Sequence, residues 1–139
     1  MLFRSLLFNM KANIPVITVL TAIFFSLILL IAQGGEDVNQ CIVKYKSEWG
    51  KPCTNCAEYN KSYRVYFRNE CYTKLDVKVA AQESDKRWKT YTKLGMGPQD
   101  TIVAYACKGT GKYMIWPKKA GDTSIELPTD EQVNEQYAE

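Results

Sequence analysis

Five cysteines are the residues best able to do chemistry in this chain of 139 residues, which contains no histidine. Cys53 and Cys56 form a C-x-x-C pair, a spacing used by thioredoxin-like redox centres, zinc sites and haem attachment sites. Covalent haem attachment needs a histidine directly after the second cysteine, where this chain has Ala57. A zinc ribbon needs two such pairs, and the chain has one. These two uses are therefore disfavoured, and redox chemistry or structural cross-linking remains.

A redox centre would place Cys53 at the start of a helix that follows a strand, because the helix N-terminus lowers the pKa of the thiol. No helical or parallel-strand pattern surrounds it here, which favours cross-linking. Residues 41–56 then form an N-terminal loop that Cys41 ties down by a bridge to Cys53 or Cys56. One thiol is left over and could join a partner chain.

The other two cysteines, Cys71 and Cys107, follow the alternation of the predicted strands. Cys71 shares a face with Val77, and Cys107 shares a face with Tyr105. If both faces point inward, the two sulfurs bridge across the core, which would stabilise the fold by about 3–4 kcal/mol in the chain-entropy model. Alternatively, both pack as buried free thiols. The disulfide candidates are therefore Cys41, Cys53, Cys56, Cys71 and Cys107.

Other catalytic patterns are incomplete. Without histidine there is no Ser-His-Asp or Cys-His machinery. The stretch "KGTGK" at residues 108–112 resembles a phosphate-binding loop, but Tyr113 stands where such a loop needs Ser or Thr. We expect no enzyme, no catalytic residue, no metal and no cofactor.

An apolar run at residues 16–32 carries no charge, with Arg4 and Lys11 before it and two acidic residues after it. Basic residues hold that end in the cytoplasm, so the rest of the chain should face outward. Residues 1–34 are then a signal peptide cleaved after Gly34. Otherwise they are an uncleaved signal anchor whose helix spans the membrane over residues 14–32. Both interpretations predict export to the periplasm or the cell exterior.

The sequence after the apolar run predicts mainly β-strands. The stretch "YRVYFRN" at residues 63–69 and "LDVKVAAQ" at residues 75–82 alternate, which predicts that Val77 is buried and Lys78 solvated. Residues 101–117 predict a hairpin around "KGTG", and residues 123–127 a last short strand. The predicted domain is an antiparallel β-sandwich or open barrel over residues 63–127, preceded by a cysteine-containing loop segment at residues 35–62.

The C-terminal segment, residues 128–139, is acidic and predicts a short helix. Thr129 can cap it, with Gln132 at the reciprocal capping position. Residues 42–119 carry 16 basic and 7 acidic side chains, whereas residues 122–139 carry six acidic and no basic ones. The acidic tail can fold against the basic body, or the body can face an anionic partner or lipid surface. The small net charge gives no reason to expect nucleic-acid binding.

The stretches "VYFRNECYTKLDVKVAAQ", "RWKTYTKLGMGPQDTIVAYAC" and "GKYMIWPKK" resemble a group of small exported bacterial β-sandwich domains of unknown function, over about residues 63–117. The matching positions are Asn69, Val77 to Ala80, Trp88, Pro98 and Tyr113. The cysteines, the turn at residues 96–99 and the acidic tail depart from that group. The resemblance implies a β-sandwich and brings no activity.

We therefore expect an exported, non-enzymatic binding or structural module stabilised by disulfides, with a protein or other envelope component as partner. Two alternatives stay open. One is a thiol-disulfide redox protein that uses Cys53 and Cys56. The other is an accessory subunit of a membrane complex, tethered by residues 14–32.

Overall fold

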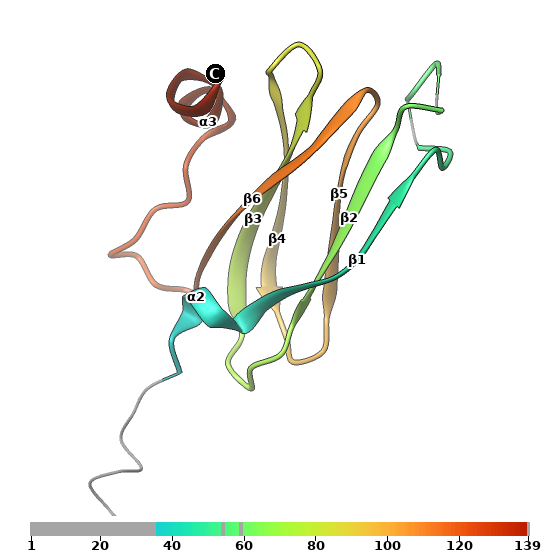
Figure 1. Ribbon diagram of the computed structural model, residues 1–139. Helices are drawn as coiled ribbons and strands as arrows, with labels where there is room; N and C mark the ends of the chain where they lie inside the picture. The colour runs from blue at the N-terminus through green and yellow to red at the C-terminus, as the bar shows by residue number, and fades with distance from the viewer. Residues whose placement is uncertain (1–35, 54, 59, 139) are drawn as a thin grey trace, which may run out of the picture. The chain divides into compact units, whose positions relative to one another are not determined.

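The computed structural model describes residues 36–138 except residues 54 and 59, and the predicted apolar helix within residues 1–34 lies outside this part of the chain (Figure 1). The described chain is mostly β-structure with short helices. In chain order the elements are α2 (Val38–Cys41), β1 (Ile42–Trp49), β2 (Tyr63–Asn69), β3 (Leu75–Glu83), β4 (Trp88–Met96), β5 (Thr101–Ala106), β6 (Gly109–Lys119) and α3 (Asp130–Tyr137). Among these helices none is long and apolar enough to cross a bilayer.

The strands form two three-stranded sheets in which all neighbours are antiparallel. The first sheet has the order β1-β2-β5 and the second the order β4-β3-β6. Their inner faces enclose one core of fully buried side chains, to which β2 contributes Val65 and Phe67, and β3 contributes Leu75, Val77 and Val79. The prediction of an antiparallel, β-rich domain is confirmed.

Strand β1 lies in the segment that the sequence assigns to a loop. Only Ile42 of this strand is buried, and the next residues are half-buried or exposed. An edge strand of this kind lacks the regular alternation by which a strand is recognised. The assignment of all of residues 35–62 to a loop is therefore wrong.

The predicted hairpin over residues 101–117 is also wrong. β5 pairs with β2 in the first sheet, whereas β6 pairs with β3 in the second. Between β5 and β6 the chain passes from the first sheet to the second. Glu83 holds this turn, because its carboxylate accepts hydrogen bonds from the backbone N–H groups of Cys107 (2.9 Å) and Lys108 (2.8 Å). At Gly109 an added Cβ would lie 2.3 Å from the Cβ of Tyr63, so the chain can make this close approach only with glycine.

Residues 123–127 form no strand. The carboxylate of Asp122 accepts hydrogen bonds from the backbone N–H of Ser124 (2.8 Å) and from its hydroxyl (2.6 Å). Such a local side-chain bond bends the backbone and competes with sheet formation. The chain therefore leaves β6 through a bent segment on its way to α3.

Strand β3 is buried on both faces, which corrects the prediction that Lys78 is solvated. Lys78 is 5% exposed, and Asp76 and Gln82 on the same outer face are also buried. Asp76 accepts hydrogen bonds from the N–H groups of Gly95 (2.8 Å) and Gly121 (3.2 Å). Gln82 accepts one from the hydroxyl of Thr110. The alternation of polarity is real, but the polar side chains are covered by other parts of the chain.

Helix α3 provides the cover over Lys78. It begins after Thr129 with the predicted capping box, in which Thr129 and Gln132 bond each other's backbone N–H groups. Val133 packs against a small apolar cluster on the outer face of the second sheet that includes Trp88. Asp130 forms an ion pair with the buried ammonium of Lys78. The expectation that the acidic tail folds against the basic body is confirmed for this pair.

Three side chains of β4 connect it to β5 and to the residue that follows β5, across the side of the sandwich. Lys89 donates to the sulfur of Cys107 (3.4 Å), Tyr91 to the carbonyl of Tyr105 (2.8 Å), and Lys93 to the carbonyl of Thr101 (3.1 Å). The outer edge of β5 thus has its hydrogen-bonding groups partly satisfied by side chains. Burial is the main reason that the pKa of Tyr91 is raised far above its ordinary value.

Asn69, at the end of β2, is fully buried and joins three segments. Its amide nitrogen donates to the carbonyls of Thr73 (2.9 Å), Met96 (3.1 Å) and Gly97 (3.2 Å), and its amide oxygen accepts from the N–H of Cys71 (3.0 Å). The side chain therefore holds the β2–β3 loop and the β4–β5 turn together at one end of the sandwich.

We predict that Asp130→Asn lowers the free energy of unfolding by about 1–3 kcal/mol at pH 7, because the buried ammonium of Lys78 loses its carboxylate. Hydrogen bonds from Lys78 and then Thr90 lower the pKa of Asp130 in the folded protein. A lowered pKa contributes stability above the unfolded value and loses it as the pH falls through the folded value. The difference between the two proteins, measured by urea denaturation, should therefore shrink below about pH 4.

Glu131→Gln is the matched control for this change, since Glu131 is the exposed neighbour in α3 and makes no ion pair within the described residues. Its effect should stay within about 0.5 kcal/mol. An equal effect of both substitutions would mean that general charge, and not the pair with Lys78, stabilises the helix.

Asn69→Ala should lower the free energy of unfolding by about 2–4 kcal/mol, because buried backbone groups in both loops lose their partners. Thermal unfolding followed by circular dichroism measures this. Asn60→Ala, at an exposed position, is the control and should change little. A small effect at Asn69 would show that water replaces its hydrogen bonds.

Candidate functional site

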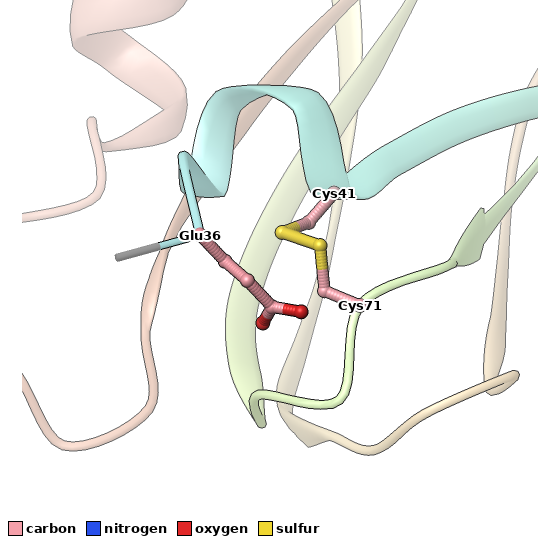
Figure 2. Close-up of side chains that lie close together, drawn as sticks. All are labelled: Glu36, Cys41 and Cys71. Carbon is pink, nitrogen blue, oxygen red and sulfur yellow. A yellow bond between two sulfur atoms is a disulfide. The ribbon is translucent and has the colours of Figure 1, made fainter. Parts of the chain in front are cut away.

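The first disulfide joins Cys41 at the end of α2 to Cys71 in the loop before β3. Figure 2 shows the carboxylate of Glu36 beside it, and the three possible ligand atoms lie within 4.8 Å of one another. Both sulfurs are bonded to each other, so they offer no thiolate to a metal ion. A hydrogen bond from the Thr73 hydroxyl (2.8 Å) is the main cause that lowers the pKa of Glu36. This cluster is a structural cross-link.

The second disulfide joins Cys56 to Cys107, and Cys53 remains a free thiol. The proposed bridges between Cys71 and Cys107, and between Cys41 and Cys53 or Cys56, are therefore wrong. The prediction assumed that Cys107 lies on the inward face of β5, and this assumption is wrong. The buried side chains of β5 are on the opposite face: Ile102, Ala104 and Ala106. Val103, Tyr105 and Cys107 therefore point away from the core. Both faces of this strand are apolar, and alternation could not decide between them.

A groove of about 760 Å³ lies at the end of the sandwich that holds the second disulfide. Asn55 and Glu58 line one part of it, and Arg87, Lys89 and Cys107 line another. The ammonium of Lys89 lies 3.4 Å from the sulfur of Cys107 and 3.7 Å from the carboxylate of Glu83. The groove therefore brings a disulfide sulfur next to a cation.

The outer face of the first sheet carries a second group of polar and aromatic side chains. Directly paired residues of antiparallel strands share a face, and Arg64 pairs with Tyr105 on β5 while Tyr66 pairs with Lys46 on β1. A bulge between Lys44 and Lys46 adds Tyr45 to this face. We name it the tyrosine–arginine face: Tyr45, Lys46, Glu48, Arg64, Tyr66, Arg68, Val103 and Tyr105.

Cations lie over the rings of this face. Lys46 Nζ is 5.1 Å from the ring centre of Tyr66, and the guanidinium of Arg68 is 5.3 Å from that of Tyr45. The Tyr66 hydroxyl donates to Glu48 (2.6 Å), and this bond is the first cause, ahead of Lys46, that lowers the pKa of Glu48. The face is thus pre-ordered by contacts among its own side chains.

The two sheets differ in whether another element covers their outer face. Figure 1 shows α3 beside the β4-β3-β6 sheet and no described element over the outer side of β1 and β2. Tyr45 is 44% exposed, while Tyr66 and Tyr105 are half-buried among their neighbours. The tyrosine–arginine face is therefore the open sheet surface of the described domain.

No family model, no curated protein and no solved structure matches this chain. Function must therefore be argued from the two sites themselves.

The sequence identified all five cysteines as disulfide candidates, and the structure places four of them in bridges. Nothing in the sequence indicates that Lys89 and Glu83 lie beside Cys107, because only the folded chain brings β3 and β4 to that residue. The alternation of Arg64, Tyr66 and Arg68 on one face of β2 was visible in the sequence. The bulge that adds Tyr45 to them was not.

We predict that peptide mapping without reduction links Cys41 to Cys71 and Cys56 to Cys107. The bridges close loops of 30 and 51 residues. Replacing both cysteines of either pair by serine should lower the free energy of unfolding by about 3–4 kcal/mol, because the unfolded chain gains entropy. Cys53→Ser, the control, should change it by less than about 0.5 kcal/mol. A peptide that joins Cys71 to Cys107 would refute this pairing.

Proposed function

We propose that this protein is an exported, non-enzymatic binding module whose tyrosine–arginine face binds an acidic segment of a protein partner. The observation that carries the proposal is the open face itself: one sheet is covered by α3, and the other presents tyrosine and arginine to solvent. Two disulfides support an oxidising compartment, and the apolar run at residues 16–32 is the expected targeting segment.

The composition of the face favours a protein partner. Tyrosine and arginine are enriched at the centres of protein interfaces, where rigid aromatic rings bury much area at low entropic cost. Small-molecule sites are concave, whereas this surface is the outer side of a three-stranded sheet. The cation–π and hydrogen-bonding contacts of Tyr45 and Tyr66 hold the rings in place before binding.

The charges of the face favour acidic groups on that partner. Lys46 and Arg68 already form ion pairs with Glu48 (2.9 Å) and Glu70 (2.6 Å). Arg64 forms none among the described residues, and it lies directly opposite Tyr105 of β5. A guanidinium offers paired donors that match a carboxylate. Arg64 is therefore the expected anchor.

Binding of a Glu-rich peptide to the full chain, followed by NMR shift mapping, tests this. We predict that Arg64→Gln weakens binding about tenfold, because a charge-assisted hydrogen bond is lost. The shifted signals should come from the three tyrosines of the face. Lys112→Gln, at an exposed position of β6, is the control for general charge and should leave the affinity unchanged.

Three results would contradict the proposal. Equal weakening by Arg64→Gln and Lys112→Gln would mean diffuse electrostatic attraction. Tighter binding to anionic phospholipid vesicles or to an acidic polysaccharide would assign another partner class. Shifts confined to the groove around Cys107 would move the binding site to the other surface.

A further inference from the structure

Three of the five sulfurs lie at the same end of the sandwich, in the loop between β1 and β2 and in the β5–β6 turn. We propose that Cys53, Cys56 and Cys107 form a disulfide-exchange centre. In it the Cys53 thiolate attacks the Cys56–Cys107 disulfide, and the chain switches between two pairings. This inference is independent of the binding face.

The turn geometry allows the second pairing. The N–H of Cys56 donates to the carbonyl of Cys53 (3.4 Å), and Asn55 between them has the left-handed φ of 66°. Two residues three positions apart that are joined by such a bond have Cα atoms within about 7 Å of each other. A disulfide requires a Cα separation of about 4.4–6.8 Å. Cys53 and Cys56 are therefore close enough to bond without a large movement of the backbone.

The exchange step needs no external oxidant. The Cys53 sulfur forms a bond to the Cys56 sulfur as the Cys56–Cys107 bond breaks, and Cys107 leaves as a thiolate that takes up a proton from solvent. One thiol and one disulfide are present before and after the step, so the electrons balance. Thiol–disulfide exchange runs through such an attack of a thiolate on a disulfide sulfur.

A cation lies beside the leaving sulfur of this reaction. The Lys89 ammonium, 3.4 Å from the Cys107 sulfur, stabilises the leaving thiolate. A nearby cation favours the thiolate form in which Cys107 leaves.

The other disulfide lacks these features. Cys41 is fully buried. The free thiol of Cys53 lies three positions from Cys56 but twelve from Cys41 in the sequence. Cys107 is half-exposed and lines the groove of about 760 Å³. Exchange is therefore confined to the second disulfide. It would break the covalent link between Cys56 and the β5–β6 turn.

The test labels the purified full chain with dilute N-ethylmaleimide under native conditions and maps the peptides without reduction. We expect two populations: one labelled at Cys53 with Cys56–Cys107 linked, and one labelled at Cys107 with Cys53–Cys56 linked. Cys53→Ser should abolish the second population, because no internal thiol remains to attack. Lys89→Met should lower the rate of Cys107 labelling several-fold.

Lys93→Met is the matched control. Lys93 lies four residues further along the same face of β4 but donates to the carbonyl of Thr101 and not to a sulfur, so its loss should leave the rate unchanged. Labelling of Cys107 that persists in Cys53→Ser, or that never occurs in the natural chain, would overturn the proposal. If Lys89→Met and Lys93→Met slow the labelling of Cys107 equally, the contact between Lys89 and the Cys107 sulfur does not promote exchange. Cys71 should stay unlabelled throughout.

Discussion

The two-sided burial of β3 is the constraint on which the rest of the domain depends. A central strand covered on both faces normally consists of apolar residues, because a buried polar group without a partner costs free energy. This strand nevertheless carries Asp76, Lys78 and Gln82 on its outer side. Each of the three finds its partner in a segment far along the chain: two glycine N–H groups, a helix carboxylate and a threonine hydroxyl. The end of β4, the turn after β6 and the position of α3 are thus coupled to a single strand.

This constraint also explains why the two sheets have different surroundings. The helix that neutralises Lys78 must lie on the outer side of the β4-β3-β6 sheet, where Val133 completes an apolar cluster with Trp88. The chain has no second described helix of comparable length for the first sheet. There the outer side chains satisfy one another through ring, cation and carboxylate contacts, and the surface stays open to other molecules.

The sequence predicts best those features that are decided locally. The inward residues of β2 and the capping box at Thr129 follow from neighbours within four positions, and both are found. The cover over Lys78 depends on Asp130, which is 52 positions away and leaves no local signal. Predicting the disulfide pairing requires knowing which face of β5 points inward. Both faces are apolar, and the face of Tyr105 and Cys107 was predicted to point to the core, whereas the structure buries the opposite face. Predicting the tyrosine–arginine face requires the alternation of side chains along β2 and also the bulge at Tyr45. The alternation can be recognised in the sequence, and the bulge cannot.

The positions of the two disulfides determine how the domain would respond to mechanical load. Strand β1 lies between Cys41 and Cys56, and both are covalently attached to other parts of the chain. A pull applied at Glu36 would pass through Cys41 into the loop at Cys71 and thus into the strand that follows, β3. The edge strand β1 is bypassed by this path and cannot be peeled from β2 one hydrogen bond at a time. The load would instead enter the domain at the start of β3, where Leu75 pairs with Lys119 of β6, so that the central strand and not the edge strand bears it.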